Sequence, residues 1–327
     1  MRQKIKIIFL CYHYIKRKDE LNRIWGHDFD LFKKHIAFLE KEYKPISMED
    51  LHLFLGGKDV DLPDKCSILT FDDGIKEQAT VIAPYLAEKN ISAVFNICPC
   101  ILDGEPATPQ VTHCGTAYYG VKKFYKLLQK YIGISGVDKY YIDLLRRKYA
   151  SGINALALNS GIKTFFKMEL PFESGRKVLL EIWHKELERD IPDIMQKIFM
   201  SEADIKNISK MNHSIGLHTN THATLDRDKS TDIFFEEELN KPKIRLESLT
   251  GNKVRCFAYP FCYEDYFLYD AKILSKMRDI GIEYIFTIFK KSNKLSRDFI
   301  GRYSSQSGDS VEILKNKIWE YEITRHY

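Results

Sequence analysis

The stretch Ser67-Ile68-Leu69-Thr70-Phe71-Asp72-Asp73-Gly74 decides how this chain is interpreted. Its apolar, β-rich half predicts a buried strand, and the acidic pair and glycine mark the carboxyl end of that strand. A glycine at this point lets the backbone turn, so Asp72 and Asp73 can face the same site although side chains within a strand alternate. The stretch therefore predicts a strand that delivers two carboxylates to one edge of a sheet.

A second stretch has the same design, because the strand-like run 213–218 is followed by Thr219-Asn220-Thr221-His222. With 10 histidines in 327 residues, about 0.3 pairs spaced like His218 and His222 are expected by chance, so the pair is a weak motif alone. Together with the pair Asp72-Asp73 it supplies two carboxylates and two imidazoles, which are able to hold a metal.

Composition excludes several classes of protein. The 50 basic and 45 acidic residues are mixed along the chain and leave a net charge of +5, so nucleic-acid binding is not expected. No run approaches the ~18 apolar residues of a membrane span, and Lys6 interrupts the apolar start, which we interpret as a strand instead of a signal peptide. The odd number of seven cysteines favours a reducing compartment. We therefore expect a cytoplasmic protein, and the sequence does not predict its oligomeric state.

Strand-like and helical patterns alternate along most of the chain, which is typical of β-α units and a parallel sheet. The strands are expected at 5–12, 66–71, 91–97, 213–219, 254–260 and 284–288, with helices at 29–42, 51–55 (preceded by an N-cap at Ser47), 77–89, 234–249 and 271–279. Residues 99–204 are charged and mostly helical, with helix candidates at 122–130, 140–149, 177–189 and 191–199. We expect a single domain, 1–327, with a helical insertion at 99–204 that covers one end of the sheet.

Three motifs in fixed order resemble those of a known family. Residues 70–74, 215–222 and Phe257-Ala258-Tyr259-Pro260-Phe261 are similar to the successive motifs of the polysaccharide deacetylase (NodB-type) family. The resemblance extends to Cys11-Tyr12-His13, 200–204, 249–251 and 300–302, and so covers most of the chain outside the insertion. It implies a distorted (β/α) barrel and a divalent metal, usually zinc, with cobalt, nickel or iron also accepted by such ligands. The implied reaction is hydrolysis of an acetyl group from an amino sugar.

The resemblance also assigns roles to residues. It implies that Asp72 is the base that takes a proton from the attacking water, and that Asp73, His218 and His222 hold the metal. The commonest family pattern places the acid on a Leu-x-His segment near the carboxyl terminus, which this chain lacks. Some members have a Tyr-His pair on the first strand instead, so His13 is the candidate acid.

Two departures from the family pattern concern the region around the motif proline. Many members have an arginine two residues before that proline, but this chain has Ala258. We therefore expect Arg302 or Arg255 to pair with Asp72 and hold it ionised. Cys262 stands where a glycine often follows, which puts the shape of that loop in doubt. Neither departure removes a metal ligand.

Each assignment has a structural alternative. The acidic pair can cap a helix or form a turn, the two metal-ligand histidines can be polar loop residues, His13 can be a rim residue and Arg302 can form a surface salt bridge. A thiolate zinc site built from Cys98, Cys100, His113 and Cys114 has no standard spacing, so core thiols are favoured. The aromatic residues of the insertion can stack on sugars, but their helical spacing favours core packing: Tyr118, Tyr119, Phe124, Tyr125, Phe165, Phe166 and Trp183.

The sequence thus predicts a metal-dependent hydrolase that removes an acetyl group, preferentially N-acetyl, from a carbohydrate. Its partner would be an acetylated sugar, a nucleotide-sugar or a glycan precursor. Two alternatives stay open. One is a hydrolase of a small-molecule amide or imide that uses the same metal site, and the other is a catalytically silent carbohydrate-binding protein.

Overall fold

A computed structural model describes residues 4–16, 24, 26–149, 154–224, 231–261, 271–289 and 297–326. Its main sheet runs in the order β10-β9-β8-β7-β6-β5-β1-β11, and every neighbouring pair on this path is parallel. The strands are β1 (Lys4–Tyr12), β5 (Lys65–Phe71), β6 (Ala93–Ile97), β7 (Ser214–Leu217), β8 (Cys256–Ala258), β9 (Tyr284–Thr287), β10 (Ile300–Gly301) and β11 (Tyr303–Ser304).

The sheet curls into a nearly closed barrel. Its first and last strands, β10 and β11, are separated in sequence only by Arg302, so the two ends of the sheet meet at this residue. Two further strands extend the sheet, since β4 (Lys44–Pro45) pairs with β5 and β12 (Ile323–His326) runs antiparallel to β1. A short pair, β2 (Ile15–Lys16) and β3 (His27–Asp28), lies apart from it. The predicted α/β barrel is confirmed.

Strand β1 shows why the barrel is stable. Ile5, Ile7 and Phe9 belong to the apolar cluster inside the barrel, whereas Ile8 and Leu10 belong to the cluster that packs against the surrounding helices. Successive side chains on a strand point to opposite faces, so the apolar part of β1, residues 7–12, is buried on both faces, as parallel sheets require. The same alternation directs Cys11 toward the end of the barrel interior, where the site lies.

Helices surround the barrel and begin at local sequence signals. The side chain of Asp28 caps α1 (Phe29–Glu42), and Ser47 forms a capping box with Asp50 at the start of α2 (Met48–Leu55), as predicted. The remaining outer helices are η1 (Gln78–Ile82), α3 (Ala83–Glu88), α11 (Glu202–Lys210), α12 (Thr231–Phe234), η5 (Phe235–Asn240), α13 (Lys241–Thr250), α14 (Ala271–Asp279) and α15 (Val311–Ile318), followed by η7 (Trp319–Tyr321). The label η marks short 3-10 or π-helical segments.

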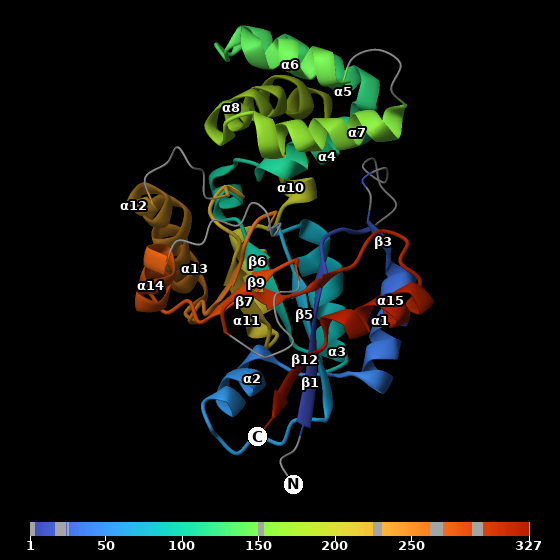
Figure 1. Ribbon diagram of the computed structural model, residues 1–327, viewed down its shortest axis with the longest axis vertical. Coiled ribbons are helices and arrows are strands. Elements are labelled where there is room, and N and C mark those ends of the chain that lie inside the picture. Colours follow the sequence, from blue (N-terminus) through green and yellow to red (C-terminus); the bar gives the residue numbers. More distant parts are fainter. Residues whose placement is uncertain are drawn as a thin grey trace.

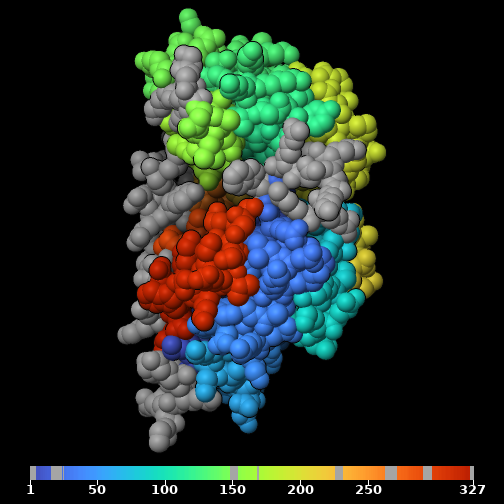
Figure 2. Space-filling view, turned by 90° about the vertical axis from the view of Figure 1, so that its right-hand side faces the viewer, coloured from blue at the N-terminus to red at the C-terminus, as the bar shows by residue number. Residues whose placement is uncertain are grey.

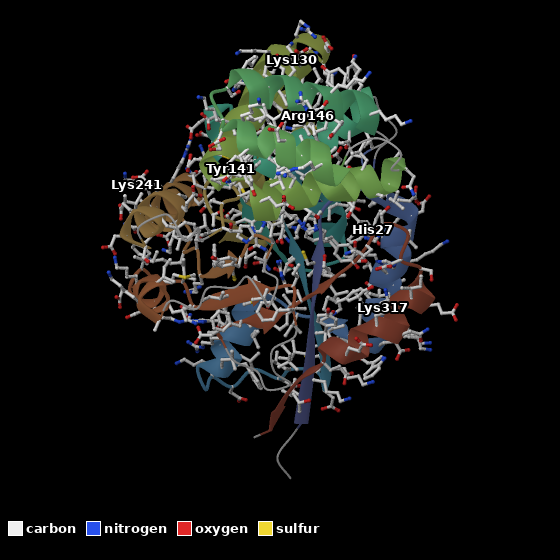
Figure 3. The ribbon with its side chains drawn as sticks, turned by 45° about the horizontal axis from the view of Figure 1, so that its top comes forward. His27, Lys130, Tyr141, Arg146, Lys241 and Lys317 are labelled. Carbon is white, nitrogen blue, oxygen red and sulfur yellow. The ribbon has the colours of Figure 1, made fainter. Side chains whose placement is uncertain are left out.

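Between β6 and β7 the chain forms a second group of helices. These are η2 (Pro99–Asp103), α4 (Thr108–Tyr119), α5 (Val121–Ile134), α6 (Lys139–Tyr149), α7 (Ala155–Thr164), η3 (Phe165–Glu169), α8 (Phe172–Ile182), η4 (Trp183–Leu187), α9 (Glu188–Asp190) and α10 (Ile194–Ile198). Helices α4 to α8 form a layer beyond the carboxyl ends of the strands (Figure 1). In the space-filling view this layer is green and lies above the blue and red segments of the barrel (Figure 2). Lys130, Tyr141 and Arg146 lie in this layer, whereas Lys317 lies on the barrel (Figure 3).

The sequence predicted this helical group in part. Helices α5, α6 and α8 overlap their predicted ranges, but α4 and α7 were not predicted. The helix expected at 191–199 is shorter, because Pro192 and the left-handed backbone of Asp193 delay its start until Ile194. The exact insertion boundaries and the single-domain assignment stay predictions. Within the described residues, no helix combines the length and the apolar character needed to cross a membrane.

Candidate active site and metal centre

The backbone after β5 turns so that both aspartates face the end of the barrel. Asp73 has a φ of 81° and Gly74 a φ of 71°, so this turn uses the left-handed region that glycine adopts freely. Three more non-glycine residues around the site also have positive φ, namely Thr219, His222 and Phe261. Such conformations cost of order ~1–3 kcal/mol each and cluster at functional sites. The predicted role of Gly74 in turning the backbone is confirmed.

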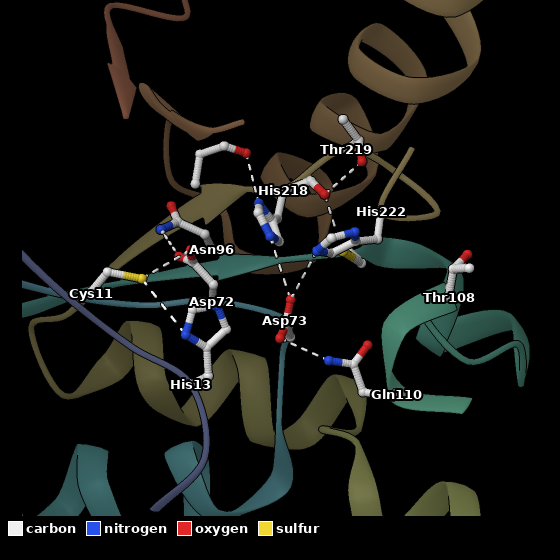
Figure 4. A network of polar contacts seen from close by, with 12 residues as sticks. Cys11, His13, Asp72, Asp73, Asn96, Thr108, Gln110, His218, Thr219 and His222 are labelled. Atoms are coloured by element: carbon white, nitrogen blue, oxygen red, sulfur yellow. Dashed lines mark hydrogen bonds and ion pairs between the residues drawn. The ribbon is translucent and has the colours of Figure 1, made fainter. Parts of the chain in front are cut away.

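Asp73, His218 and His222 converge on one point. The Oδ1 atom of Asp73 lies 3.4 Å from Nε2 of His218 and 3.5 Å from Nε2 of His222, and all three side chains are buried. The other oxygen, Oδ2, accepts a hydrogen bond of 2.8 Å from Gln110, whereas Oδ1 has no hydrogen-bond partner in the described chain. Figure 4 shows the two rings pointing at this oxygen.

This arrangement fits a divalent cation. Nδ1 of His218 lies 2.7 Å from the carbonyl oxygen of Ala258, which can only accept, so the neutral ring carries its proton there and turns the Nε2 lone pair toward Asp73. Burial lowers the pKa of His222 to about 3, with His218 adding to the shift, so this ring is also neutral. Burial opposes a charge on the His218 ring, but the charges of Asp72 and Asp73 prevail and raise its pKa above the usual value. The two carboxylates therefore favour positive charge at this point, and a cation held by Nε2 of both rings and Oδ1 of Asp73 supplies it. The donor set is one that zinc, cobalt, nickel and iron accept.

Asp72 lies beside the candidate metal centre and is held from several sides. Arg302 donates to both of its oxygens at 2.8 Å, Asn96 donates to Oδ1 at 2.7 Å, and the thiol of Cys11 donates to Oδ2 at 3.3 Å. Burial opposes ionisation of Asp72, but the charge of Arg302 overcomes it and holds the pKa well below its usual value. Asp72 is therefore a carboxylate at neutral pH.

Of the two arginines predicted to pair with Asp72, the structure selects Arg302. Its side chain is fully buried, which excludes the surface salt-bridge alternative. Arg255 instead forms ion pairs with Glu49 and Glu283 on the outside of the barrel.

His13 follows β1 directly and lies half-buried near Asp72. Its Nδ1 atom is 3.9 Å from Sγ of Cys11. His13, Asp72 and the three candidate metal ligands all line one cavity of about 760 Å³, which lies between the barrel and the insertion. This volume is in the usual range of small-molecule sites. All six sequence-predicted site residues, including Arg302, are thus brought together here.

Comparison with known proteins was made on sequence and on structure. Residues 184–285 match the family model described as polysaccharide deacetylase. The resemblance to polysaccharide deacetylases is confirmed. The matched segment contains His218 and His222 but ends short of Arg302 and begins after the two aspartates. A search of curated proteins found no significant match.

Solved structures with the deacetylase barrel extend the likeness to nearly the whole fold. The Streptococcus pyogenes deacetylase PplD in complex with acetate has 14% identity and a TM-score of 0.55, covering 97% of this chain and 99% of its own. IcaB from Ammonifex degensii has 17% identity and a TM-score of 0.55, with 97% of both chains covered. A de-N-acetylase from Aggregatibacter actinomycetemcomitans has 16% identity and a TM-score of 0.55, covering 95% of this chain and 99% of its own. At such identities the likeness concerns the fold.

Several residues around the candidate metal centre were not predicted. Asn96 is a polar residue inside the otherwise apolar strand β6, and this signal could have identified it. Gln110 lies on a helix that the sequence did not predict. Glu238 accepts hydrogen bonds of 2.9 Å from the backbone N–H groups of Asn220 and Thr221, and so fixes the loop between the two histidines. Nothing in the sequence pattern distinguishes Gln110 or Glu238 from other polar residues.

Other candidates from the sequence do not join the candidate metal centre as ligands. No thiolate cluster forms among Cys98, Cys100, His113 and Cys114 in the described chain, and the three thiols are buried. Tyr259 and Phe261 line the cavity, as do parts of the insertion. Among the insertion aromatics, Phe124, Phe165 and Trp183 are fully buried in its core, Phe166 lines the cavity and Tyr118 is exposed. Cys262 lies outside the described residues.

Proposed function

We propose that this protein is a metal-dependent hydrolase that removes an acetyl group, most naturally an N-acetyl group, from a carbohydrate. The observation that carries the proposal is the convergence of Oδ1 of Asp73 with Nε2 of His218 and of His222, next to an ionised Asp72. The family match and the barrel fold support carbohydrate deacetylation as the reaction. The proposed partner is an acetylated sugar, a nucleotide-sugar or a glycan precursor, and a cytoplasmic location stays a prediction.

Asp73, His218 and His222 would hold the cation, with zinc preferred. When bound, a divalent cation polarises the acetyl carbonyl and lowers the pKa of the water that attacks it. Asp72 accepts the proton that this water loses. Because Arg302 and Asn96 hold both its oxygens in place, Asp72 keeps one orientation before and during the reaction. The charge of Arg302 also keeps Asp72 ionised, which a base requires.

His13 is the proposed acid. The amine that leaves an amide must gain a proton, and a general acid has to lie within reach of it inside the cavity. His13 lines the cavity, is half-buried, and lies beside Cys11 and Asp72 (Figure 4). The half-buried ring of His13 can therefore reach a substrate amide without leaving its strand end.

Acetate release from purified full-length protein tests the proposal. The panel contains N-acetylated sugars, an O-acetylated sugar, a nucleotide-sugar and small amides and imides, each assayed after chelation and after return of zinc. We expect acetate from acetylated sugars, lost with the chelator and restored by the metal. Turnover of an amide or imide with none of any sugar would contradict the proposed substrate class. Sugar binding without acetate release under all conditions would support a silent binding protein.

A further inference from the structure

Two short segments of the barrel rim form the part of the cavity wall next to His13. Gly26 and His27 contribute from the start of β3, and residues 304–307 contribute from the end of β11 and the loop after it. The second segment consists of three serines and a glutamine. His27 lies at the edge of the barrel that faces the insertion (Figure 3), and burial lowers its pKa, so its ring is neutral at pH 7. This part of the wall is therefore polar but uncharged.

Backbone hydrogen bonds fix both segments relative to His13. The N–H group of Ser305 donates to the carbonyl oxygen of Cys11 at 3.0 Å. The N–H group of His27 donates to the carbonyl oxygen of Tyr14 at 2.9 Å. Cys11 and Tyr14 stand on either side of His13 in the chain, and a charge on His13 acts on the His27 ring to lower its pKa. The side chains of Ser305 and His27 thus lie close to the proposed acid.

Asp309 holds the loop after β11 in one shape. Its Oδ2 atom accepts a hydrogen bond of 2.8 Å from the N–H group of Gln306 and one of 2.6 Å from the hydroxyl of Tyr303. The hydroxyl of Ser307 donates to the carbonyl oxygen of Gly26 at 2.7 Å, which joins the loop to the segment before β3. The polar side chains of this wall are therefore already in place before a ligand binds.

The side chains of Ser305 and His27 contain polar atoms that the protein leaves unpaired. Ser305 is 7% exposed, and its Oγ atom has no hydrogen-bond partner within the residues that the structure describes. His27 is 2% exposed, and the nearby backbone of Ser305 can serve at most one of its two unpaired ring nitrogens. Such atoms are costly to bury without a partner, and most buried polar groups have one. Because both residues line the cavity, a molecule bound there can supply the missing partners.

We propose that His27 and Ser305 form a subsite for the hydroxyl groups of a neutral sugar. That this sugar belongs to the substrate rests on the proposed function, whereas the subsite itself does not. A neutral imidazole offers one donor and one acceptor, and a serine hydroxyl offers both, as each hydroxyl of a sugar also does. A phosphate or a carboxylate is bound best by a cationic side chain, which neither segment contains. The subsite therefore favours a carbohydrate over a small amide that has no hydroxyl group.

Sugar binding tests the subsite without catalysis. Calorimetric titration with di-N-acetylchitobiose uses full-length protein that carries Asp72→Asn, so that the sugar is not consumed. In this background we expect Ser305→Ala and His27→Phe each to weaken binding by about three- to tenfold. Phenylalanine keeps an aromatic ring at position 27 but has no ring nitrogens. Ser67→Ala removes a buried hydroxyl outside the cavity and should bind as the parent protein does. Equal binding by the parent and all variants, or no binding at all, would overturn the proposal.

Thermal unfolding distinguishes an unpaired hydroxyl from a structural one. The hydroxyl of Ser67 donates to the carbonyl oxygen of Tyr43 at 2.6 Å, so Ser67→Ala should lower the melting temperature. Ser305→Ala removes a buried hydroxyl that has no partner, so its melting temperature should equal or exceed that of the wild type. A loss in Ser305→Ala as large as that in Ser67→Ala would assign Ser305 a structural role and overturn the subsite.

Kinetics then locate the hydroxyl groups and relate the subsite to the proposed function. The substrates are N-acetylglucosamine and di-N-acetylchitobiose. In Ser305→Ala we expect KM to rise by about threefold or more with little change in kcat. A rise for both sugars assigns the hydroxyl groups to the acetylated ring, and a rise for the disaccharide alone assigns them to the adjoining ring. Acetate release with an unchanged KM for both would overturn the subsite and leave the proposed function intact. Sugar binding that depends on Ser305, without acetate from any acetylated sugar, would support the subsite and contradict the proposed function.

Discussion

Arg302 and Asp72 are joined by two hydrogen bonds of 2.8 Å although 230 residues separate them in sequence. Arg302 is the single residue between β10 and β11, the two ends of the sheet. Closing the barrel therefore brings the guanidinium to the carboxylate that follows β5. Asp72, the proposed base, pairs with Arg302 only when the barrel has closed, so assembly of the site is coupled to folding.

Replacing Arg302 should be costly for stability. Arg302→Met leaves the buried Asp72 without its cation, and removing one partner of a buried ion pair typically costs about 3–5 kcal/mol. We expect a loss of this size in the free energy of unfolding, measured by urea denaturation. Arg255→Met removes a half-buried arginine whose ion pairs lie on the outside of the barrel, and as the matched control it should cost less than about 1 kcal/mol. A similar, small loss in both variants would contradict the buried pair.

Asp72→Asn should separate catalysis from binding. Asparagine keeps the shape of the side chain but cannot accept the proton, so acetate release should fall by at least about 100-fold. The metal content, measured by elemental analysis, should be unchanged because Asp73, His218 and His222 remain. Asp232→Asn, on the surface of α12, serves as the control with full activity. Undiminished turnover in Asp72→Asn would remove Asp72 from the role of base.

Gly216 on β7 should tolerate no side chain. A Cβ atom there would lie 2.1 Å from Oδ1 of Asn96 and 3.2 Å from the carbonyl oxygen of Cys256, so Asn96 would have to leave Asp72. We expect Gly216→Ala to lower the free energy of unfolding by about 1–3 kcal/mol and to reduce turnover. Gly133→Ala, on α5, meets only Ile142 at 3.6 Å and should be neutral or slightly stabilising. Equal unfolding midpoints for the two variants would refute this contact.

Stability of the insertion should depend on pH through Glu186. Burial opposes its ionisation, but hydrogen bonds from Tyr131, Lys130 and Arg189 prevail and lower its pKa below the usual 4.5. A lowered folded-state pKa stabilises the protein above the unfolded-state value, and this stabilisation is lost as the pH falls through the folded-state pKa. The difference in melting temperature between wild type and Glu186→Gln should therefore be largest near neutral pH and shrink below about pH 4. A pH-independent difference would contradict the prediction.

The barrel and its catalytic edge could be predicted because their signals are local. The apolar run before Asp72 marks a buried strand, and the parallel arrangement of such strands places Asp73 and His218 at the same edge of the sheet. For the partner of Asp72 the sequence left two arginines, Arg302 and Arg255. Only the closure of the barrel shows that Arg302 is the one that pairs with it.

The rest could not be predicted because it depends on packing between distant segments. Gln110 donates a hydrogen bond to Asp73 from α4. The apolar residues of this helix form only a weak amphipathic pattern, so the sequence did not predict it. Cys11 resembles any small buried residue in an apolar strand, and its contact with Asp72 follows from the register of β1 on β5.

The metal stoichiometry of the purified protein tests the central claim most directly. Zinc is titrated into chelator-treated wild type and into Asp73→Asn, and bound metal is counted by elemental analysis after dialysis. We predict one divalent cation per chain in the wild type and a loss of at least tenfold in affinity in Asp73→Asn, with both proteins folded by circular dichroism. Equal metal content in the two proteins, or acetate release by a wild type that contains no metal, would contradict the account.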